Sequence, residues 1–298
     1  NGLALVETHL GNLPEALRLV TDGLALLDRE LEPDEHRLHR SVLRYNRAQV
    51  LAGLGRLDEA LADYDAVIAV DPNYPEYHFD RANLLHRLDR DDEALVEYDT
   101  TIALGPPFPE AYYNRAELWL EAGATEQALA GMSYVLELDP TFLDAYVNRA
   151  GIYLAADDLD AALADARAGL LLDPVNPHLH TVVGQVHAER SEFTEARSAF
   201  DTALAGAPDL VSALSGRAGV AYELGDVDAA IADLGAAVAT TPEDAGLQFN
   251  LAFVYQSAEQ WDDALAHLAT AAELAPDDPE ITDAQEQCRA KVSVTARS

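Results

Sequence analysis

The sequence has very little cysteine, lysine and methionine, with one residue of each among 298. The single cysteine, Cys288, excludes an internal disulfide framework and any zinc site made of several cysteines. Lysine and arginine together number 19 against 53 aspartate and glutamate residues, so the formal net charge is -34. A field of this sign repels nucleic acid and anionic membranes, and we predict neither as a partner.

Long apolar runs are also missing. No stretch approaches the roughly 20 apolar residues that a bilayer crossing needs, which favours a cytoplasmic location. Because the chain starts at Asn1 and not at methionine, an N-terminal signal or an upstream segment stays open.

Motifs of catalysis and cofactor binding are absent too. The sequence has no glycine-rich phosphate loop, no HExxH pair and no cysteine–histidine nucleophile arrangement. His178, His180 and His187 fall in one predicted helix, where we favour packing and hydrogen bonding over a metal site. We therefore predict a protein that is not an enzyme and that has no cofactor and no metal site.

What the sequence does contain is a repeat of 34 residues. Segments such as LDEALADYDAVIAVDP recur seven times, and the prolines that close them are Pro72, Pro106, Pro140, Pro174, Pro208, Pro242 and Pro276. An alanine twelve residues before each proline keeps the same step. Ala16 begins the alanine series but lies 44 residues before Ala60, so ten extra residues separate the first unit from the second.

Each unit divides into two predicted helices. In the unit that starts at Pro109, the first helix ends at Gly123, a residue suited to a left-handed cap, and the second stops at Pro140. Apolar residues recur at intervals of three and four, and no alternating run of β-branched residues predicts a strand. Connections of two to four residues force antiparallel neighbours, and such pairs bury their faces by stacking into an elongated array.

The period, the small residue in the first helix, the alanine and aromatic residue in the second helix and the closing proline resemble the tetratricopeptide repeat family. The resemblance implies an all-α fold, a right-handed superhelical solenoid of antiparallel helix pairs with about eight units and a C-terminal capping helix. Residues 1–40 are then a partial first unit with the ten-residue insertion, and residues 279–298 are the capping helix and a tail. The seven full units cover 41–278 as 41–74, 75–108, 109–142, 143–176, 177–210, 211–244 and 245–278. Departures from the family pattern are Met132, Ala166, Leu234 and Leu268, which replace the aromatic residue of the second helix.

The insertion and the C-terminal end need separate interpretation. Pro33 followed by Asp34 and Glu35 is a good helix start, so we predict one helix over 34–54, about two turns longer than the other first helices. Its basic residues either form ion pairs with the acidic segment 28–35 or bind an acidic partner or a second copy of the chain. They are His36, Arg37, His39, Arg40 and Arg44. We expect the capping helix over 279–290 and a tail over 291–298.

Comparing one unit with another predicts ion pairs inside the units. An arginine at the seventh place of a unit meets an acid sixteen residues later in four units, and an antiparallel helix pair brings these two places level. The predicted pairs are Arg47–Asp63, Arg81–Glu97, Arg149–Asp165 and Arg217–Asp233. Arg115 lacks such an acid, since Gly131 stands there. The alternative is that these arginines reach a ligand.

The resemblance places the partner-binding surface on the concave side, which first helices line in this family. At the fifth and sixth places of the units stand aromatic and amide-bearing residues, and a carboxamide both donates and accepts hydrogen bonds, so it can pair with a peptide backbone of any sequence. The predicted peptide-binding residues are Tyr45, Asn46, Phe79, Asp80, Tyr113, Asn114, Asn148 and Phe249. The alternative is that these side chains pack and hydrogen-bond between neighbouring first helices.

The predicted function is a non-catalytic scaffold that binds a protein or peptide on this surface. Acids such as Glu76, Glu110 and Glu117 favour a partner that carries arginine or lysine. Family members that hold a C-terminal carboxylate use lysines and arginines in their first three units, and a chain without lysine before Lys291 argues against that clamp. One alternative is a regulatory or substrate-recruiting portion of a larger enzyme. Another is self-association through the incomplete first unit, whose apolar residues are Leu3, Leu5, Val6 and Leu10.

Overall fold

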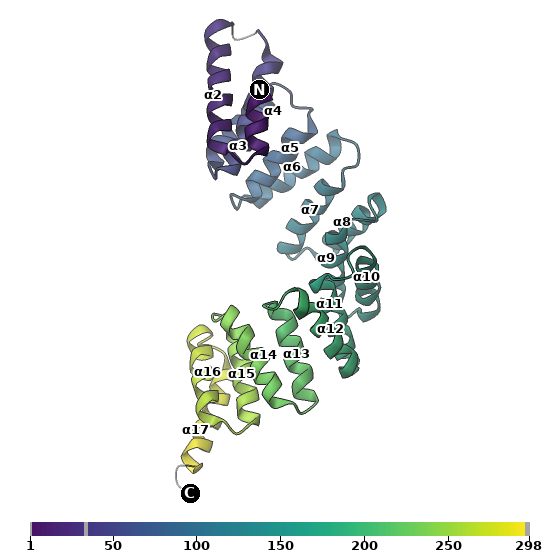
Figure 1. The fold of residues 1–298 in the computed structure, drawn as a ribbon, viewed down its shortest axis with the longest axis vertical. Helices are drawn as coiled ribbons and strands as arrows, with labels where there is room; N and C mark the ends of the chain where they lie inside the picture. Colours follow the sequence, from purple (N-terminus) through teal and green to yellow (C-terminus); the bar gives the residue numbers. More distant parts are fainter. Residues whose placement is uncertain (1, 33–34, 296–298) are drawn as a thin grey trace. The chain divides into compact units, whose positions relative to one another are not determined.

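The computed structural model describes residues 2–32 and 35–295, and in this part of the chain it contains helices and no strand. The chain forms two compact units, Asn1–Phe142 with helices α1–α8 and Leu143–Ser298 with helices α9–α17 (Figure 1). The predicted all-α fold of helix pairs is therefore confirmed.

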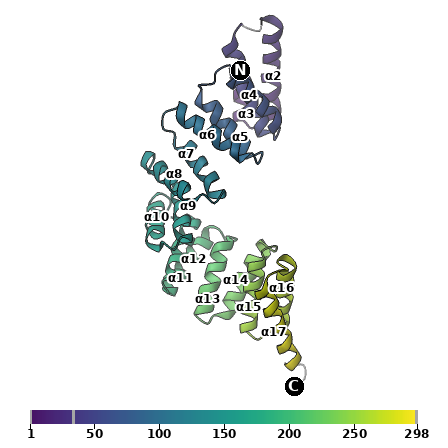
Figure 2. The same cartoon turned by 180° about the vertical axis from the view of Figure 1, so that it is seen from behind.

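Helices of the first unit pair in chain order. They are α1 (Gly2–His9), α2 (Leu13–Glu30), α3 (Arg37–Gly53), α4 (Leu57–Ile68), α5 (Pro75–His86), α6 (Asp91–Leu104), α7 (Pro109–Glu121) and α8 (Thr125–Leu138). The most extensive contacts join α3 to α4, α5 to α6 and α7 to α8, and within this unit α4 packs on α5 and α6 packs on α7 (Figure 2).

The second unit continues the same order. Its helices are α9 (Leu143–Ala155), α10 (Leu159–Leu172), α11 (Pro177–Glu189), α12 (Phe193–Gly206), α13 (Val211–Glu223), α14 (Val227–Thr240), α15 (Ala245–Ser257), α16 (Trp261–Leu274) and α17 (Pro279–Thr295). The last helix packs on α16 and buries Ile281 and Cys288 against it.

Helix starts follow the local sequence. Proline is the first residue of α5, α7, α11 and α17, where its missing N–H would lack an intrahelical partner in any case. A side chain also caps some starts: Asn176, directly before Pro177 of α11, accepts a hydrogen bond from the Leu179 N–H at 3.1 Å, and Asp244, directly before α15, accepts one from the Leu247 N–H at 3.0 Å.

Small residues allow the paired helices to approach closely. The alanines that recur every 34 residues are fully buried in both helices of the pairs, as at Ala48 and Ala60. Phe200 shows how a large side chain fits this scheme. A Cβ atom built on Gly184 would lie 2.7 Å from its ring and one on Gly216 would lie 2.4 Å from it, so both glycines make room for the ring.

One backbone conformation marks the turn inside every helix pair. A residue with positive φ stands at the same place of all seven full units, and the glycines among them are Gly55, Gly123 and Gly225, with φ of 74–78°. The other four are Asp89, Asp157, Ser191 and Glu259, with φ of 56–59°. Gly11, with φ of 75°, lies 44 residues before Gly55, which is the offset that the ten-residue insertion produces.

The insertion lengthens two helices and adds the connection between them. Helix α2, a second helix, has 18 residues, whereas the second helices α4, α6 and α8 have 12 or 14; α3, a first helix, has 17, whereas the first helices α5 and α7 have 12 and 13. The start predicted at Asp34 is wrong, because α3 begins at Arg37, directly after His36, whose φ of 52° interrupts the helix. The predicted start signal at Pro33 and Asp34 lies outside the described residues.

At the other end, α17 continues further than expected. It runs to Thr295, so residues 291–295, predicted as part of a tail, are helical. Residues 296–298 of that predicted tail lie outside the described residues.

Candidate interaction surface

Three first helices of the first unit, α3, α5 and α7, present the predicted polar and aromatic side chains at equivalent places. We call this set of residues the α3–α5–α7 surface. It consists of Tyr45, Asn46, Gln49, Phe79, Asp80, Asn83, Tyr113, Asn114 and Glu117. Asn46 is buried, Gln49 is exposed, and the others are half-buried. Gln49, Asn83 and Glu117 stand at the ninth place of their repeats; Glu117 was predicted as an acid of this surface, whereas Gln49 and Asn83 were not predicted.

Asp80 joins α3 to α5. Its Oδ2 accepts a hydrogen bond from the Tyr45 hydroxyl at 2.7 Å and another from Gln49 Nε2 at 3.0 Å. Burial raises the pKa of the Asp80 carboxyl above its ordinary value, against the opposite effect of these donors. Burial and the neighbouring Asp80 charge raise the pKa of the Tyr45 hydroxyl as well, so it remains a donor.

Asn83 joins α5 to α7 in a similar way. Its Oδ1 accepts hydrogen bonds from the Tyr98 hydroxyl at 2.5 Å and from Asn114 Nδ2 at 2.8 Å. Burial raises the pKa of the Tyr98 hydroxyl to about 12. Tyr45, Asp80 and Asn114 therefore bond between neighbouring helices, which is the alternative role that the sequence left open for them.

Two aromatic residues of the surface pack on the connections that precede the next first helices. Phe79 lies 4.7 Å from Phe108 between ring centroids, and Tyr113 lies 4.8 Å from Phe142. The Tyr113 hydroxyl also donates to Glu117 Oε1 at 2.8 Å, one turn further along α7. Each ring keeps part of its surface exposed to solvent.

The remaining two predicted residues belong to the second unit. Asn148 is half-buried on α9. Phe249 packs from α15 against the core that includes Leu268 and Cys288. The structure thus brings six of the eight predicted residues together within the first unit.

A groove in the second unit contains aromatic residues that the sequence reasoning missed. It has a volume of about 260 Å³ between α13 and α15, and its lining includes Gly219, Tyr222, Asn250 and Phe253. The Tyr222 and Phe253 rings lie 5.5 Å apart, and Phe253 is 50% exposed. The available signal was a phenylalanine at the ninth place of its repeat, where the three preceding repeats have Gly151, Gln185 and Gly219.

All four predicted ion pairs inside the units are confirmed. Their nitrogen–oxygen distances are 2.6–2.7 Å, the arginine side chains are 18–28% exposed and the carboxylates 7–13%. The pairs are Arg47–Asp63, Arg81–Glu97, Arg149–Asp165 and Arg217–Asp233. Hydrogen bonding to the paired carboxylate raises the pKa of Arg47 and of Arg149.

Some of these arginines also bond to the preceding pair of helices, an arrangement that was not predicted. The acid lies sixteen residues before the arginine, as in Arg81–Asp65 at 2.9 Å and Arg217–Asp201 at 2.7 Å. Arg115, which has Gly131 at the place of the paired acid, bonds to Asp99 on α6. The arginines thus face the second helices and carry ion pairs from one helix pair to the next.

In the predicted basic patch, Arg40 pairs with the acidic segment 28–35 through Asp28. It is 9% exposed, bonds to Asp28, and donates to the carbonyl oxygens of Leu27 at 2.9 Å and Leu31 at 3.1 Å. It therefore satisfies carbonyl groups at the C-terminal end of α2. Arg37 and Arg44 line a groove of about 390 Å³ beside it.

Two of the three histidines of α11, His180 and His187, have separate hydrogen-bond partners. His180 Nε2 lies 2.9 Å from the Pro174 carbonyl oxygen, and His187 Nδ1 lies 2.5 Å from Glu192 Oε2.

The apolar residues of the incomplete first repeat are 40–74% exposed: Leu3, Leu5 and Val6 on α1 and Leu10 directly after it. Self-association through them stays a prediction.

Comparison with known families decides what kind of repeat this is. Models described as the tetratricopeptide repeat or TPR repeat match residues 48–89, 147–211 and 221–288. The chain belongs to the tetratricopeptide repeat family. No curated protein sequence matches this TPR chain.

Solved structures share the fold at low sequence identity. A chain of the APC/C hetero-tetramer Cut9–Hcn1 matches with a TM-score of 0.69 and 17% identity over 92% of this chain, which spans about half (54%) of that one. A tetratricopeptide repeat protein from Parabacteroides merdae matches with a TM-score of 0.67 and 17% identity, over 84% of this chain and 98% of its own. Yeast Tom70 matches with a TM-score of 0.55 and 20% identity, over 96% and 59%.

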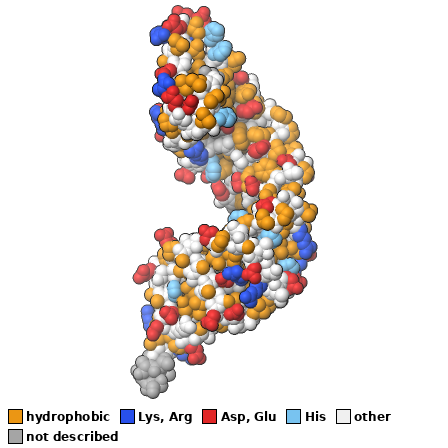
Figure 3. Space-filling view, viewed as in Figure 1, with side chains coloured by type: hydrophobic (Ala, Val, Ile, Leu, Met, Phe, Trp, Pro, Cys, Tyr) orange, Lys and Arg blue, Asp and Glu red, His pale blue; other side chains and the backbone are white. Residues whose placement is uncertain are grey.

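Acidic residues far outnumber basic residues in the TPR chain. Acidic side chains are scattered over the face drawn in Figure 3, and basic side chains are few. Among the described residues, no helix combines the length and the apolar character that a membrane crossing needs.

Proposed function

We propose that this TPR protein is a non-catalytic scaffold whose α3–α5–α7 surface binds a segment of another protein that carries arginine or lysine. Membership of the family supports protein binding, because the concave side of first helices usually binds partners in this family. The observation that carries the cationic preference is the direction of the arginines on these helices.

Arg81 and Arg115 are the arginines within α5 and α7, and both bond to acids of second helices. Arg87, directly after α5, donates to the Ala52 carbonyl oxygen. The first helices also carry exposed carboxylates, Glu76 and Glu110. Since Arg81, Arg87 and Arg115 bond to acids and a carbonyl group of other helices, the part of the surface on α5 and α7 keeps its negative charge for a cationic partner.

Peptide geometry is compatible with this surface. Stacked first helices place equivalent side chains on the order of 10 Å apart, and an extended peptide advances about 3.3 Å per residue. Equivalent groups on α5 and α7 can therefore contact roughly every third residue of a bound peptide. A protein that recruits substrates for an enzyme would use the same surface, so the experiment below also applies to that alternative.

A binding experiment with matched charge variants tests the proposal. The probe is a fluorescent extended peptide with arginine at every third position, measured by anisotropy with EDTA present, and a second peptide with glutamate at those positions is the negative control. We expect the double variant Glu110→Gln/Glu117→Gln on α7 to weaken binding about 3- to 10-fold, consistent with the loss of one or two charge interactions near the protein surface.

The matched control is Glu126→Gln/Glu137→Gln, which changes the net charge equally on exposed residues of α8. We expect it to change affinity less than twofold. An equal loss in both double variants would mean that the peptide responds to the overall charge, and the α3–α5–α7 surface would no longer be the proposed site.

A further inference from the structure

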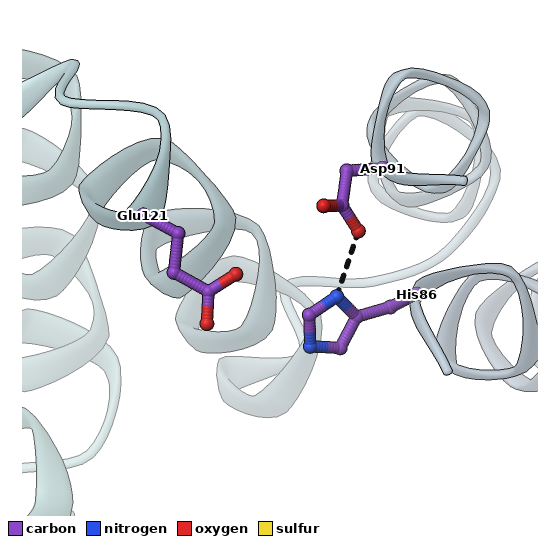
Figure 4. Close-up of side chains that lie close together, drawn as sticks. All are labelled: His86, Asp91 and Glu121. Carbon is purple, nitrogen blue, oxygen red and sulfur yellow. Dashed lines mark hydrogen bonds and ion pairs between the residues drawn. The ribbon is translucent and has the colours of Figure 1, made fainter. Parts of the chain in front are cut away.

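Beside the proposed surface, three potential metal ligands from three helices lie close together. His86 is the last residue of α5, Asp91 the first of α6 and Glu121 the last of α7, and Figure 4 shows their side chains directed toward one another. The nitrogen and carboxylate oxygen atoms all lie within 4.8 Å of each other. His86 and Glu121 are 35 residues apart, about one repeat, so the stacking of consecutive repeats brings them together.

The local backbone holds two of these residues in place. Asp89, with φ of 56°, forms the turn between α5 and α6, and its N–H donates to the His86 carbonyl oxygen at 2.9 Å. His86 Nδ1 lies 2.8 Å from Asp91 Oδ1 and forms a hydrogen bond with it. This bond orients the imidazole ring beside both carboxylates.

The donor set is one imidazole nitrogen and two carboxylates, which suits a divalent transition ion such as Zn²⁺. Ligands about 2.0–2.2 Å from a tetrahedral ion lie roughly 3.5 Å apart. Asp91 and Glu121 are exposed and His86 is half-buried, so side-chain rotations can close the remaining distance.

Neighbouring cations do not occupy the cluster. Arg87 donates to the Ala52 carbonyl oxygen, and Arg90 donates through Nε and Nη2 to Glu93 at 2.7 Å. Within the described part of the chain, His86 is the partner found for Asp91 among basic side chains. Two carboxylates in a chain of net charge -34 therefore face the imidazole without an arginine between them.

We propose that His86, Asp91 and Glu121 bind one zinc-class divalent ion, with water completing its coordination. The ion links the α5–α6 pair to α7, so its binding stabilises the first unit across the contact between two consecutive repeats. This site goes beyond the proposed function, because peptide binding is measured with EDTA present and does not depend on the ion.

The test is calorimetric titration of the metal-stripped full chain with ZnCl₂, with thermal unfolding measured in parallel. We expect one Zn²⁺ per chain, a dissociation constant in the micromolar range and a rise in Tm that EDTA reverses. His86→Ala and Glu121→Gln should each weaken binding about 10-fold or more. Circular dichroism of the ion-free variants establishes that they remain folded.

The matched control variant is His187→Ala. His187 and Glu192 repeat the five-residue spacing and the hydrogen bond of His86 and Asp91, and no third ligand group completes a cluster there among the described residues. Zinc affinity should be unchanged in this variant. Unchanged affinity in His86→Ala, equal weakening in His187→Ala, or equally tight binding of Mg²⁺ would overturn the proposal.

Discussion

At the scale of single residues, the same polar side chain serves the stability of the repeat array and faces the proposed partner. Asp80 is the clearest case, because it accepts hydrogen bonds from Tyr45 and Gln49 and still has a raised pKa. Four other units have asparagine at this sixth place, which supplies the acceptor without the charge. A charged group that the fold disfavours is consistent with a role in recognition.

Asp80→Asn should therefore stabilise the protein at neutral pH, by about 0.5–1 kcal/mol. The folded state raises the pKa of Asp80, so it binds more protons than the unfolded state, and the contribution of Asp80 to stability falls as the pH rises through that pKa. The gain from Asp80→Asn is then largest near pH 7 and shrinks as the pH falls toward about 4.

Urea unfolding of both proteins at several pH values measures this difference. Asp80→Asn should also weaken binding of the arginine-containing peptide, because the surface loses a negative charge. A variant that is less stable than the parent at pH 7, with a difference that does not change with pH, would show that the ionised carboxylate stabilises the fold.

Only part of the polar bonding at this scale could be predicted from the sequence. Ion pairs inside a unit were predictable, since two places at equal distance from a turn must come level in an antiparallel pair. The bond from Arg115 to Asp99 and the burial of Arg40 among the α2 carbonyl groups were not, because they depend on how one helix pair rotates against the next.

At the scale of helices, the turn within each pair contains one residue in the left-handed backbone conformation. This residue is glycine in only three of the seven full repeats. A residue with a Cβ atom costs about 1–2 kcal/mol in this conformation, less for aspartate. Ser191 and Glu259 are exposed and have φ of 58–59°, so they bear this cost without a compensating burial.

Replacing Glu259 by glycine should stabilise the protein by about 0.5–1 kcal/mol, because relief of the left-handed strain exceeds the added freedom of the unfolded chain. Thermal or urea unfolding measures the gain. The matched control is Gly225→Ala, at the equivalent place with φ of 78°, which should destabilise by a similar or larger amount. A loss of stability in Glu259→Gly would mean that the glutamate side chain contributes more than its backbone strain costs.

At the scale of the whole molecule, the net charge of -34 opposes folding through long-range repulsion, while the ion pairs act locally. The paired carboxylates are 7–13% exposed in the four pairs inside the units, so solvent ions reach them poorly. Dissolved salt should therefore screen the repulsion more than it weakens the pairs.

We accordingly expect the Tm to rise by several degrees when NaCl is increased from about 10 mM to about 500 mM, as the screening length falls from roughly 30 Å to below 8 Å. A scan with potassium chloride separates screening from specific sodium binding. A Tm that falls with salt would show that ion pairs dominate the electrostatic energy of this chain.

The repeat period, the helix pairs, the left-handed turn at Gly123 and the ion pairs inside units follow from the sequence alone, because each depends on residues within one unit. Contacts between consecutive repeats were decided by the tertiary structure. They are the Asn83–Asn114 hydrogen bond, the hydrogen bonds of Asp80 and the proximity of His86 to Glu121. The physical reason is that local periodicity determines which face of a helix is buried, whereas the rotation of one pair on the next, set by side-chain packing, determines which polar groups on the remaining faces come within bonding distance.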